Sequence, residues 1–407
     1  MSPPEQSGAA AGDEPAAEAY HQRISVPFDY PVHFTHHVLS ADNPLLAGAM
    51  NRLGEDRRHR AIAYVDGGLA AAQPDVMERI KEYFHERPKE LELAAPPQVT
   101  PGGEGAKNGW AVVRDVMTAL GNLHLDRQSF VVVLGGGAVL DMVGFAASLV
   151  HRGMRLVRVP TTTIAQNDAG VGVKNGMDEH GQKNFVGTFA PPFAVLNDFE
   201  FLRTLADRDW LGGVAEAFKV AIIADAPFFQ WLCAHAADLR RRDQATMEQC
   251  VRRCAILHLE HIRTSGDPFE LGSARPLDFG HWVGHKLETM SDYRIGHGQA
   301  VAIGIAMDSF YAMRQGLLDE ADFARILKGL TAAGLPVWSE LLSRRDSGGT
   351  LTVLDGLRQF REHLGGALNV TLPDGLGRKV EVHQVNPQLV EQAVEHLAGH
   401  RGEDGGE

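Results

Sequence analysis

The sequence predicts two domains: an α/β domain with an open parallel sheet at residues 20–200, then a mainly α-helical domain at residues 201–398. Two observations support this prediction. From residue 20 to 198, short β-branched apolar runs alternate with helix-like segments, as in nucleotide-binding sheets. After residue 199, long helical patterns dominate, and good strand candidates are almost absent until residues 368–372. We expect the domain boundary near residues 198–205.

The elements of the first domain follow one another in a regular order. Residues 61–66 predict a strand that ends in a carboxylate, and a helix follows at roughly residues 75–85. The apolar run 129–134 predicts a strand that stops at three glycines, and residues 156–159 predict another strand, which ends at a proline. Such continuous apolar runs are typical of parallel strands covered on both faces.

The composition limits the class of protein. Of the 407 residues, 44% are hydrophobic and 22% are charged, which suits a globular enzyme. The net charge of -13 argues against a general nucleic-acid surface, because phosphate backbones require clustered lysine and arginine. The cysteines Cys233, Cys250 and Cys254 form no CxxC pair, so we expect buried, reduced thiols.

The two ends differ in composition from the rest of the chain. Residues 1–19 lack a basic start followed by an apolar core, so we expect a disordered leader rather than a signal peptide. We expect residues 399–407 to form a flexible tail. No apolar run approaches the roughly 20 residues that span a membrane. The sequence therefore predicts a cytoplasmic enzyme without a membrane partner.

Three consecutive glycines, Gly135, Gly136 and Gly137, directly follow the predicted strand 129–134. Without β-carbons the backbone can approach a pyrophosphate closely, and a helix that begins near Ala138 would direct its amide groups at it. On their own, the glycines fit a simple tight turn equally well.

Polar residues follow two other predicted strands. Asp66 could bind a ribose hydroxyl, although it could equally cap a turn. The segment Pro-Thr-Thr-Thr at residues 160–163 adds hydroxyl groups. Because the carboxyl ends of parallel strands meet at one edge of a sheet, these residues predict a phosphate or nucleotide site there.

Histidines gather in the second domain. His281 and His285 are four residues apart, so a helix would place them on one face, and His297 follows twelve residues later. Glu216 could add a carboxylate, which would complete a catalytic zinc-type site with an open position. The alternative is that these histidines are surface or core residues. We assign no role to the neighbouring histidines His36, His37, His258 and His261.

Five segments, taken in order, resemble the 3-dehydroquinate synthase family and its relatives, the sugar-phosphate cyclases. They are GGGAVLDMVGFAASLVHRG, VPTTTIAQNDAGVGVKNG, GQKNFVGTFAPPFAVLND, GGVAEAFKVAII and LDFGHWVGHKLE…GHGQAVAIG. The likeness spans roughly residues 66–382. It implies an α/β N-terminal NAD-binding domain, a mainly α-helical C-terminal metal-binding domain, and an active site between them.

The resemblance also implies roles for individual residues. The metal ligands would be Glu216, His281 and His297, holding zinc or cobalt, whereas His285 would contact substrate, which corrects the argument from spacing. The NAD set would be Asp66, Glu104, Lys107, Gly135, Gly136, Gly137, Asp141, Thr161, Thr162, Lys183 and Thr204. The substrate and phosphate contacts would be Asp168, Lys174, Asn184, Lys219 and His285. Arg152 would reach the active site of the neighbouring subunit in a homodimer.

The implied reaction is a phosphate elimination followed by ring closure. NAD+ oxidises a hydroxyl, phosphate leaves, NADH returns the hydride, and an intramolecular aldol step closes the ring, so there is no net redox change. This chemistry makes the chain a carbon–oxygen lyase of the kind used in cyclitol biosynthesis.

Several positions depart from the pattern of dehydroquinate synthase proper. Glu260 lies about where the family has a lysine, Arg275 is displaced by one residue, and Asp278 replaces an asparagine. Residues 361–363 read Arg-Glu-His where a lysine pair is usual. Because a substrate carboxylate needs cationic partners, we expect a neutral seven-carbon ketose phosphate such as sedoheptulose 7-phosphate.

Three alternatives remain open on the sequence. One is a divergent 3-dehydroquinate synthase that holds its acid substrate with Arg275 or Arg263. Another is a metal-dependent NAD polyol dehydrogenase, which the phosphate-binding cations disfavour. The third is a non-catalytic descendant, which the retained ligands and lysines disfavour.

Overall fold

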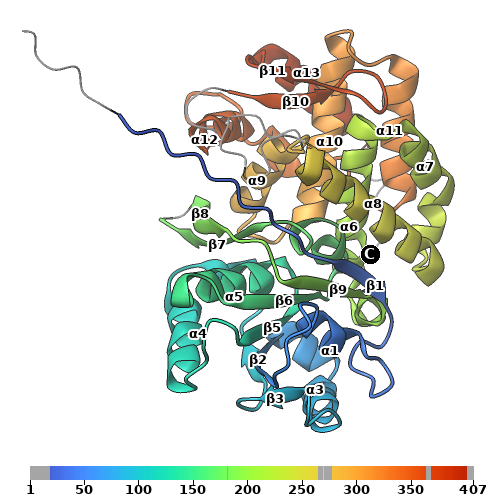
Figure 1. Ribbon diagram of the computed structural model, residues 1–407. Coiled ribbons are helices and arrows are strands. Elements are labelled where there is room, and N and C mark those ends of the chain that lie inside the picture. Colours follow the sequence, from blue (N-terminus) through green and yellow to red (C-terminus); the bar gives the residue numbers. More distant parts are fainter. Residues whose placement is uncertain (1–18, 181, 265–268, 270–276, 364–367, 401–407) are drawn as a thin grey trace, which may run out of the picture.

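The computed structural model describes residues 19–180, 182–264, 269, 277–363 and 368–400. Figure 1 shows a sheet with its helices at the bottom and a larger group of helices at the top. The expected leader and tail lie, except for residues 19, 399 and 400, outside the described residues.

Seven strands of the described chain form one parallel sheet in the order β1-β9-β6-β5-β2-β3, with β4 also paired to β2. They are β1 (Val32–Thr35), β2 (His59–Asp66), β3 (Leu91–Leu93), β4 (Gln98–Thr100), β5 (Phe130–Gly135), β6 (Arg155–Pro160) and β9 (Ala194–Asp198). β5 is buried along its whole length, as its apolar run predicted. The α/β fold class of this half is confirmed.

Side chains of the central strands alternate between two apolar cores. In β2, Ala61 and Val65 pack with α1 (Leu45–Met50) and α3 (Val76–His85), whereas Ile62 and Tyr64 pack on the opposite face. That opposite face is covered by α4 (Ala111–Asn122) and α5 (Gly137–Leu149). The short helix α2 (Gly67–Ala72) begins directly after β2. The carboxyl ends of the strands stay uncovered by these helices, which leaves them available for a site.

An antiparallel hairpin, β7 (Lys174–Glu179) and β8 (Gln182–Phe189), is inserted between β6 and β9. The sequence analysis did not predict it, because β8 alternates between exposed and half-buried residues and both strands are polar. In Figure 1 the hairpin lies between the sheet and helix α9, at the junction of the two halves.

The second half is mainly helical, as predicted, and its helices pack around a single apolar core. They are α6 (Asp207–Ala224), α7 (Ala226–Arg240), α8 (Gln244–Thr264), α9 (His281–Met290), α10 (His297–Arg314), α11 (Glu320–Ala332), α12 (Asp355–His363) and α13 (Pro387–Leu397). The strand predicted at residues 368–372 is β10 (Val370–Pro373), which pairs with β11 (Lys379–Val382). Among the described residues, no helix combines the length and the hydropathy of a membrane span.

The segment Phe199–Thr204 connects the two halves as a short 3₁₀ helix. Phe199 and Leu202 pack into the helical core, whereas Phe201 packs into the sheet core. Because this segment belongs to both cores, we propose it as the domain boundary.

Helices α9 and α10 approach each other through glycines. Gly280 has a φ of +78° and precedes α9. A β-carbon on Gly304 of α10 would lie 1.9 Å from the carbonyl oxygen of Gly280, and one on Gly298 would lie 2.4 Å from the Cα of Gly212 in α6. Since backbone atoms are the neighbours, no side-chain movement can relieve such a contact. The residue before α9 is thereby held against the middle of α10, and the start of α10 is held against α6.

We expect the substitution Gly304→Ala to lower the free energy of unfolding by about 1–3 kcal/mol, because the added methyl group overpacks the contact between the helices. The matched control is Gly121→Ala in α4, where a β-carbon meets no atom within 4 Å. Urea unfolding followed by circular dichroism measures both. Equal stability of the Gly304→Ala variant and the wild type would contradict the proposed close contact.

Candidate active site

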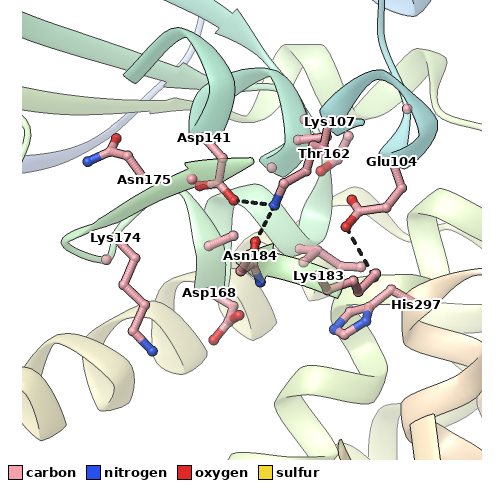
Figure 2. A pocket seen from close by; sticks show the side chains of 18 of the residues that line it. Glu104, Lys107, Asp141, Thr162, Asp168, Lys174, Asn175, Lys183, Asn184 and His297 are labelled. Atoms are coloured by element: carbon pink, nitrogen blue, oxygen red, sulfur yellow. Dashed lines mark hydrogen bonds and ion pairs between the residues drawn. The ribbon is translucent and has the colours of Figure 1, made fainter. Parts of the chain in front are cut away.

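A cavity of about 970 Å³ lies between the carboxyl ends of the sheet strands, the β7–β8 hairpin and the helices α6, α8 and α9. Figure 2 shows polar side chains from both halves directed into it. Most of the predicted site residues line it. They are Asp66, Glu104, Lys107, Gly136, Gly137, Asp141, Thr161, Thr162, Asp168, Lys174, Lys183, Asn184, Thr204, Lys219, His281, His285 and His297.

Three predicted residues do not line this cavity. Gly135 lies just behind it, where its carbonyl accepts a hydrogen bond of 3.0 Å from the amide of Thr161. Glu216 is buried beneath the cavity wall in α6. Arg152 is exposed, follows α5 and has a φ of +62°. The position of Arg152 on the surface leaves its proposed role in a neighbouring subunit as a prediction.

The glycine-rich turn, residues 135–137, borders the cavity on the side of the sheet. Gly136 is the N-cap of α5, whose first residues face the cavity without a capping side chain. A β-carbon on Gly135 would lie 3.0 Å from Val139 and 3.1 Å from the β-carbon of Asp66, so the turn needs glycine for close packing. The exposed amide end of a 13-residue helix is suited to a phosphate group.

Asp66 caps a helix and also faces the cavity, so the structure is compatible with both roles that the sequence left open. Its carboxylate accepts a hydrogen bond of 2.7 Å from the amide of Gly68 and so caps α2, and it also faces the cavity. Gly136 donates a second, longer hydrogen bond of 3.4 Å to it. The carboxylate is therefore fixed at the edge of the glycine-rich turn.

Two lysines, buried Lys107 and half-buried Lys183, contact acidic side chains beside this turn. Lys107 Nζ lies 2.9 Å from Asp141 and 2.5 Å from the side-chain oxygen of Asn184. Lys183 Nζ lies 3.1 Å from Glu104, and Figure 2 shows both sets of contacts. Although burial disfavours the ammonium, Asp141 and Glu104 raise the pKa of Lys107. Although burial opposes it as well, Glu288 and Glu104 raise the pKa of Lys183, so both lysines are held as cations.

The three predicted metal ligands converge in the helical half. Nε2 of His297 lies 3.3 Å, and Nε2 of His281 3.9 Å, from one oxygen of Glu216. These donor atoms all lie within 4.8 Å of one another. Nδ1 of His281 lies 3.2 Å from the carbonyl of Phe279, and Nδ1 of His297 lies 3.2 Å from Glu288. Each imidazole thus has one nitrogen held by an acceptor, which orients the other toward the centre of the group.

This donor set fits a divalent metal. Neither oxygen of Glu216 accepts a hydrogen bond of normal geometry, although both are buried. Burial, followed by the charge of Lys219, lowers the pKa of His281 to about 4, which keeps this imidazole neutral and able to bind metal. Although burial opposes it, Glu288 and Glu216 raise the pKa of His297 to about 10. One buried carboxylate and two imidazoles converge on one point, a donor set that a divalent cation can bind.

A second group of charged side chains is centred on Asp168. Lys219 Nζ lies 2.5 Å from Glu216 and 4.0 Å from Asp168, and Nδ1 of His258 lies 2.9 Å from Asp168. Although burial opposes both effects, the two carboxylates raise the pKa of Lys219, and Lys219 and His258 lower that of Asp168. A charged lysine and a charged aspartate are therefore presented side by side.

Asp168 lies in a π-helical turn, Ala165–Ala169. The turn is fixed by two neighbouring amides: Gln166 donates to the carbonyls of Pro160 and Asp198, and Asn167 donates to the carbonyl of Gly213. π-Helical turns are often found at functional sites. This one lies between β6 and β7 and contacts α6 through Asn167, so Asp168 faces Lys219.

Two expectations from the sequence need correction. His258 and His261, to which we assigned no role, both line the cavity from α8. Glu260, which we placed near the position of the family lysine, is exposed and forms an ion pair with Arg263 on the outer side of α8. Helical geometry explains both, since residues 258, 261 and 262 share a face that residue 260 does not. Arg275 lies outside the described residues.

Glu288 is a site residue that the sequence analysis missed. It is buried, and it contacts Lys183 as well as His297. The sequence feature that could have indicated Glu288 is its position three residues after His285, which places both on one helix face in the segment that carries the histidines.

Fold and cavity together define a two-domain enzyme in which a glycine-rich edge of a parallel sheet faces a histidine–carboxylate group. The chain also matches two family models, 3-dehydroquinate synthase N-terminal at residues 98–212 and 3-dehydroquinate synthase C-terminal at residues 213–352. The 3-dehydroquinate synthase of Blochmanniella pennsylvanica is 34% identical over 297 residues, which are 72% of this chain and 80% of that protein. The chain belongs to the 3-dehydroquinate synthase family.

Solved structures of sugar cyclases are similar over nearly the whole chain. ValA, the 2-epi-5-epi-valiolone synthase of Streptomyces hygroscopicus, solved with NAD+ and Zn2+ bound, has a TM-score of 0.82 and 30% identity, and covers 94% of this chain and 100% of its own. A 2-deoxy-scyllo-inosose synthase has a TM-score of 0.74, 22% identity, and coverage of 90% and 96%, which shows a shared fold.

We expect Glu216→Gln to lose metal binding, because the amide removes the charge and one ligand oxygen. The loss of affinity should exceed the roughly 10–100-fold that outer carboxylates contribute. Metal content after dialysis measures it. Glu200→Gln is the control, since Glu200 also faces two imidazoles, those of His36 and His37, but lies outside the cavity. Unchanged metal content in Glu216→Gln would remove Glu216 from the ligand set.

Proposed function

We propose that this chain is a sugar-phosphate cyclase that acts on a neutral seven-carbon ketose phosphate such as sedoheptulose 7-phosphate. Phosphate is eliminated and the ring closes, with NAD+ and a divalent metal as cofactors. The observation that carries the choice of substrate is the composition of one cavity wall. Its described residues are His258, His261, Ile262, Leu277 and Asp278.

This wall provides no lysine or arginine side chain for a substrate carboxylate among the residues that the structure describes. Arg263 pairs with Glu260 away from the cavity. Asp278 is itself an acid, close enough to Lys219 to help raise the pKa of that lysine. A substrate carboxylate would be repelled there, whereas a sugar hydroxyl can donate a hydrogen bond to Asp278.

The comparisons support the class and leave two substrate types to distinguish. The curated relative at 34% identity is a 3-dehydroquinate synthase, whereas the structural relative at 30% identity is a 2-epi-5-epi-valiolone synthase with NAD+ and Zn2+. We favour the neutral substrate because of Asp278 and because none of the described wall residues is a lysine or an arginine. A divergent 3-dehydroquinate synthase is the alternative.

The proposed NAD+ site is the sheet edge. The amide end of α5 would receive the pyrophosphate, and Asp66 and Glu104 would accept hydrogen bonds from ribose hydroxyls. The remaining members of the set line the same edge, except for Gly135, which shapes it from behind: Lys107, Gly135, Gly136, Gly137, Asp141, Thr161, Thr162, Lys183 and Thr204. Glu216, His281 and His297 would hold zinc or cobalt. When bound, NAD+ supplies a reversible hydride acceptor and the metal a Lewis acid for the substrate oxygens.

The chain's own residues position the substrate between these two sites. Lys219 stays cationic between Glu216 and Asp168, so it can donate to an oxygen that gains negative charge. Asp168 can accept a hydrogen bond from a substrate hydroxyl. We propose that Lys174, Asn184 and His285 bind the phosphate. Arg152 of a neighbouring subunit would complete that phosphate site in a homodimer.

We expect the metal-loaded protein with NAD+ to release phosphate from sedoheptulose 7-phosphate and to form a cyclic ketone without accumulating NADH. The same assay contains the acid precursor of 3-dehydroquinate and a simple polyol. Colorimetric phosphate release, absorbance of NADH and mass spectrometry of the product are followed together. Turnover of the acid alone would overturn the substrate assignment, and steady NADH formation from the polyol would favour a dehydrogenase.

Asp278→Asn tests the wall itself. We expect kcat/KM for the neutral substrate to fall about tenfold, as one charge-assisted hydrogen bond is weakened, while kcat/KM for the acid rises because the repulsion is removed. Glu381→Gln is the control: this carboxylate contributes to the electrostatics around Asp278 but accepts hydrogen bonds from Thr371 outside the cavity. An unchanged ratio of the two kcat/KM values would contradict a role for Asp278 in specificity.

A further inference from the structure

Glu288 is a buried carboxylate with two cationic or polar partners on opposite sides. It lies on α9, and its side chain is 3% exposed. One oxygen lies 2.8 Å from Lys183 Nζ, and the other lies 3.2 Å from Nδ1 of His297. Both oxygens of the carboxylate are therefore engaged, each by a different part of the protein.

On the helical side, Glu288 determines the orientation of one imidazole. The two nitrogens of His297 face different carboxylates, since Nε2 faces Glu216 and Nδ1 faces Glu288. A hydrogen bond from Nδ1 leaves the lone pair on Nε2, which points toward the metal group. The corresponding acceptor for His281 is the neutral carbonyl of Phe279. Of the two imidazoles in the predicted metal group, only that of His297 is therefore oriented by a charged acceptor.

On the sheet side, Lys183 connects Glu288 to the proposed nucleotide site. Lys183 belongs to β8, and its Nζ is shared between Glu288 and Glu104 of the 3₁₀ turn Glu104–Lys107. The ring of Tyr293 lies 5.5 Å from the same Nζ. The contacts Glu104–Lys183–Glu288–His297 therefore form one continuous chain across the junction of the two domains.

We propose that Glu288 is a positioning residue that couples NAD+ binding to metal binding through Lys183. This inference rests on the proposed function, because it takes NAD+ and a divalent metal as the two ligands. A ribose hydroxyl that binds Glu104 reduces the competition for Lys183. Lys183 then holds Glu288 more firmly, and Glu288 holds His297 in the orientation that binds metal. Because such coupling is reciprocal, bound metal also strengthens NAD+ binding.

The test measures metal affinity of the metal-stripped protein by competition with a chelator, with and without saturating NAD+. In the wild type we expect NAD+ to tighten zinc binding by about 5–150-fold. In Glu288→Gln we expect zinc affinity to fall about 10–100-fold and the effect of NAD+ to disappear. The visible absorption of the cobalt-loaded variant should also change, since it reports ligand geometry.

Two further variants separate coupling from a general loss of structure. Lys183→Met breaks the same chain of contacts without touching a residue next to the metal group, and we expect it to remove the NAD+ effect with a smaller loss of zinc affinity than Glu288→Gln. It also serves if Glu288→Gln does not fold. Glu55→Gln is the matched control, because Glu55 pairs with Arg155 outside the cavity. It should behave as the wild type.

Each outcome supports or overturns the proposal. Zinc affinity and NAD+ dependence like those of the wild type in both Glu288→Gln and Lys183→Met would overturn it. Loss of all metal from Glu288→Gln, with metal kept by Glu216→Gln, would also overturn it, because Glu288 would then be a ligand together with His285 and His297. A wild type that binds both ligands without mutual influence refutes the coupling alone. A wild type that binds neither refutes the proposed function.

Discussion

The buried charge of Glu216 is the constraint on which the site depends. A carboxylate buried in the middle of α6 is costly unless opposite charge and hydrogen-bond donors surround it. Lys219 comes from the same helix, and His281 and His297 come from the first residues of α9 and α10. The three helices must therefore meet at this point, and the cavity opens directly above it. The apolar core holds the helices together, and the ionic cluster determines the rotation of each helix about its own axis.

The sheet half contributes two cations, buried Lys107 and half-buried Lys183. Lys183 lies between two carboxylates, and Lys107 lies between the carboxylate of Asp141 and the amide oxygen of Asn184. Such residues cannot leave the cavity without exposing uncompensated acids, so they hold the 3₁₀ turn, the hairpin and α9 in register. The site is thus an alternation of fixed charges of both signs. An alternating arrangement can bind a phosphate ester and a polyhydroxylated chain in the same space, because each polar group of the ligand meets its complement.

The sequence was sufficient for the elements with strong local signals. β2, β5 and β6 are apolar runs, and the helix expected at residues 75–85 is α3. Short or polar strands were missed, above all the β7–β8 hairpin, because their stability comes from partners distant in the chain. The resemblance supplied residues that spacing alone could not, since spacing favoured His285 as a ligand. The contact of Lys183 with Glu288 joins residues 105 positions apart. No local pattern encodes such a pair.

The glycine contact between α9 and α10 affects which residues can be substituted during evolution. Because Gly280 and Gly304 bring main chain against main chain, main-chain atoms rather than aliphatic side chains set the distance between the start of α9 and the middle of α10. Those side chains can exchange over time while this distance is preserved. Members of such a lineage can therefore diverge widely in their interiors, and in the pocket walls that select a ligand, around an unaltered catalytic frame.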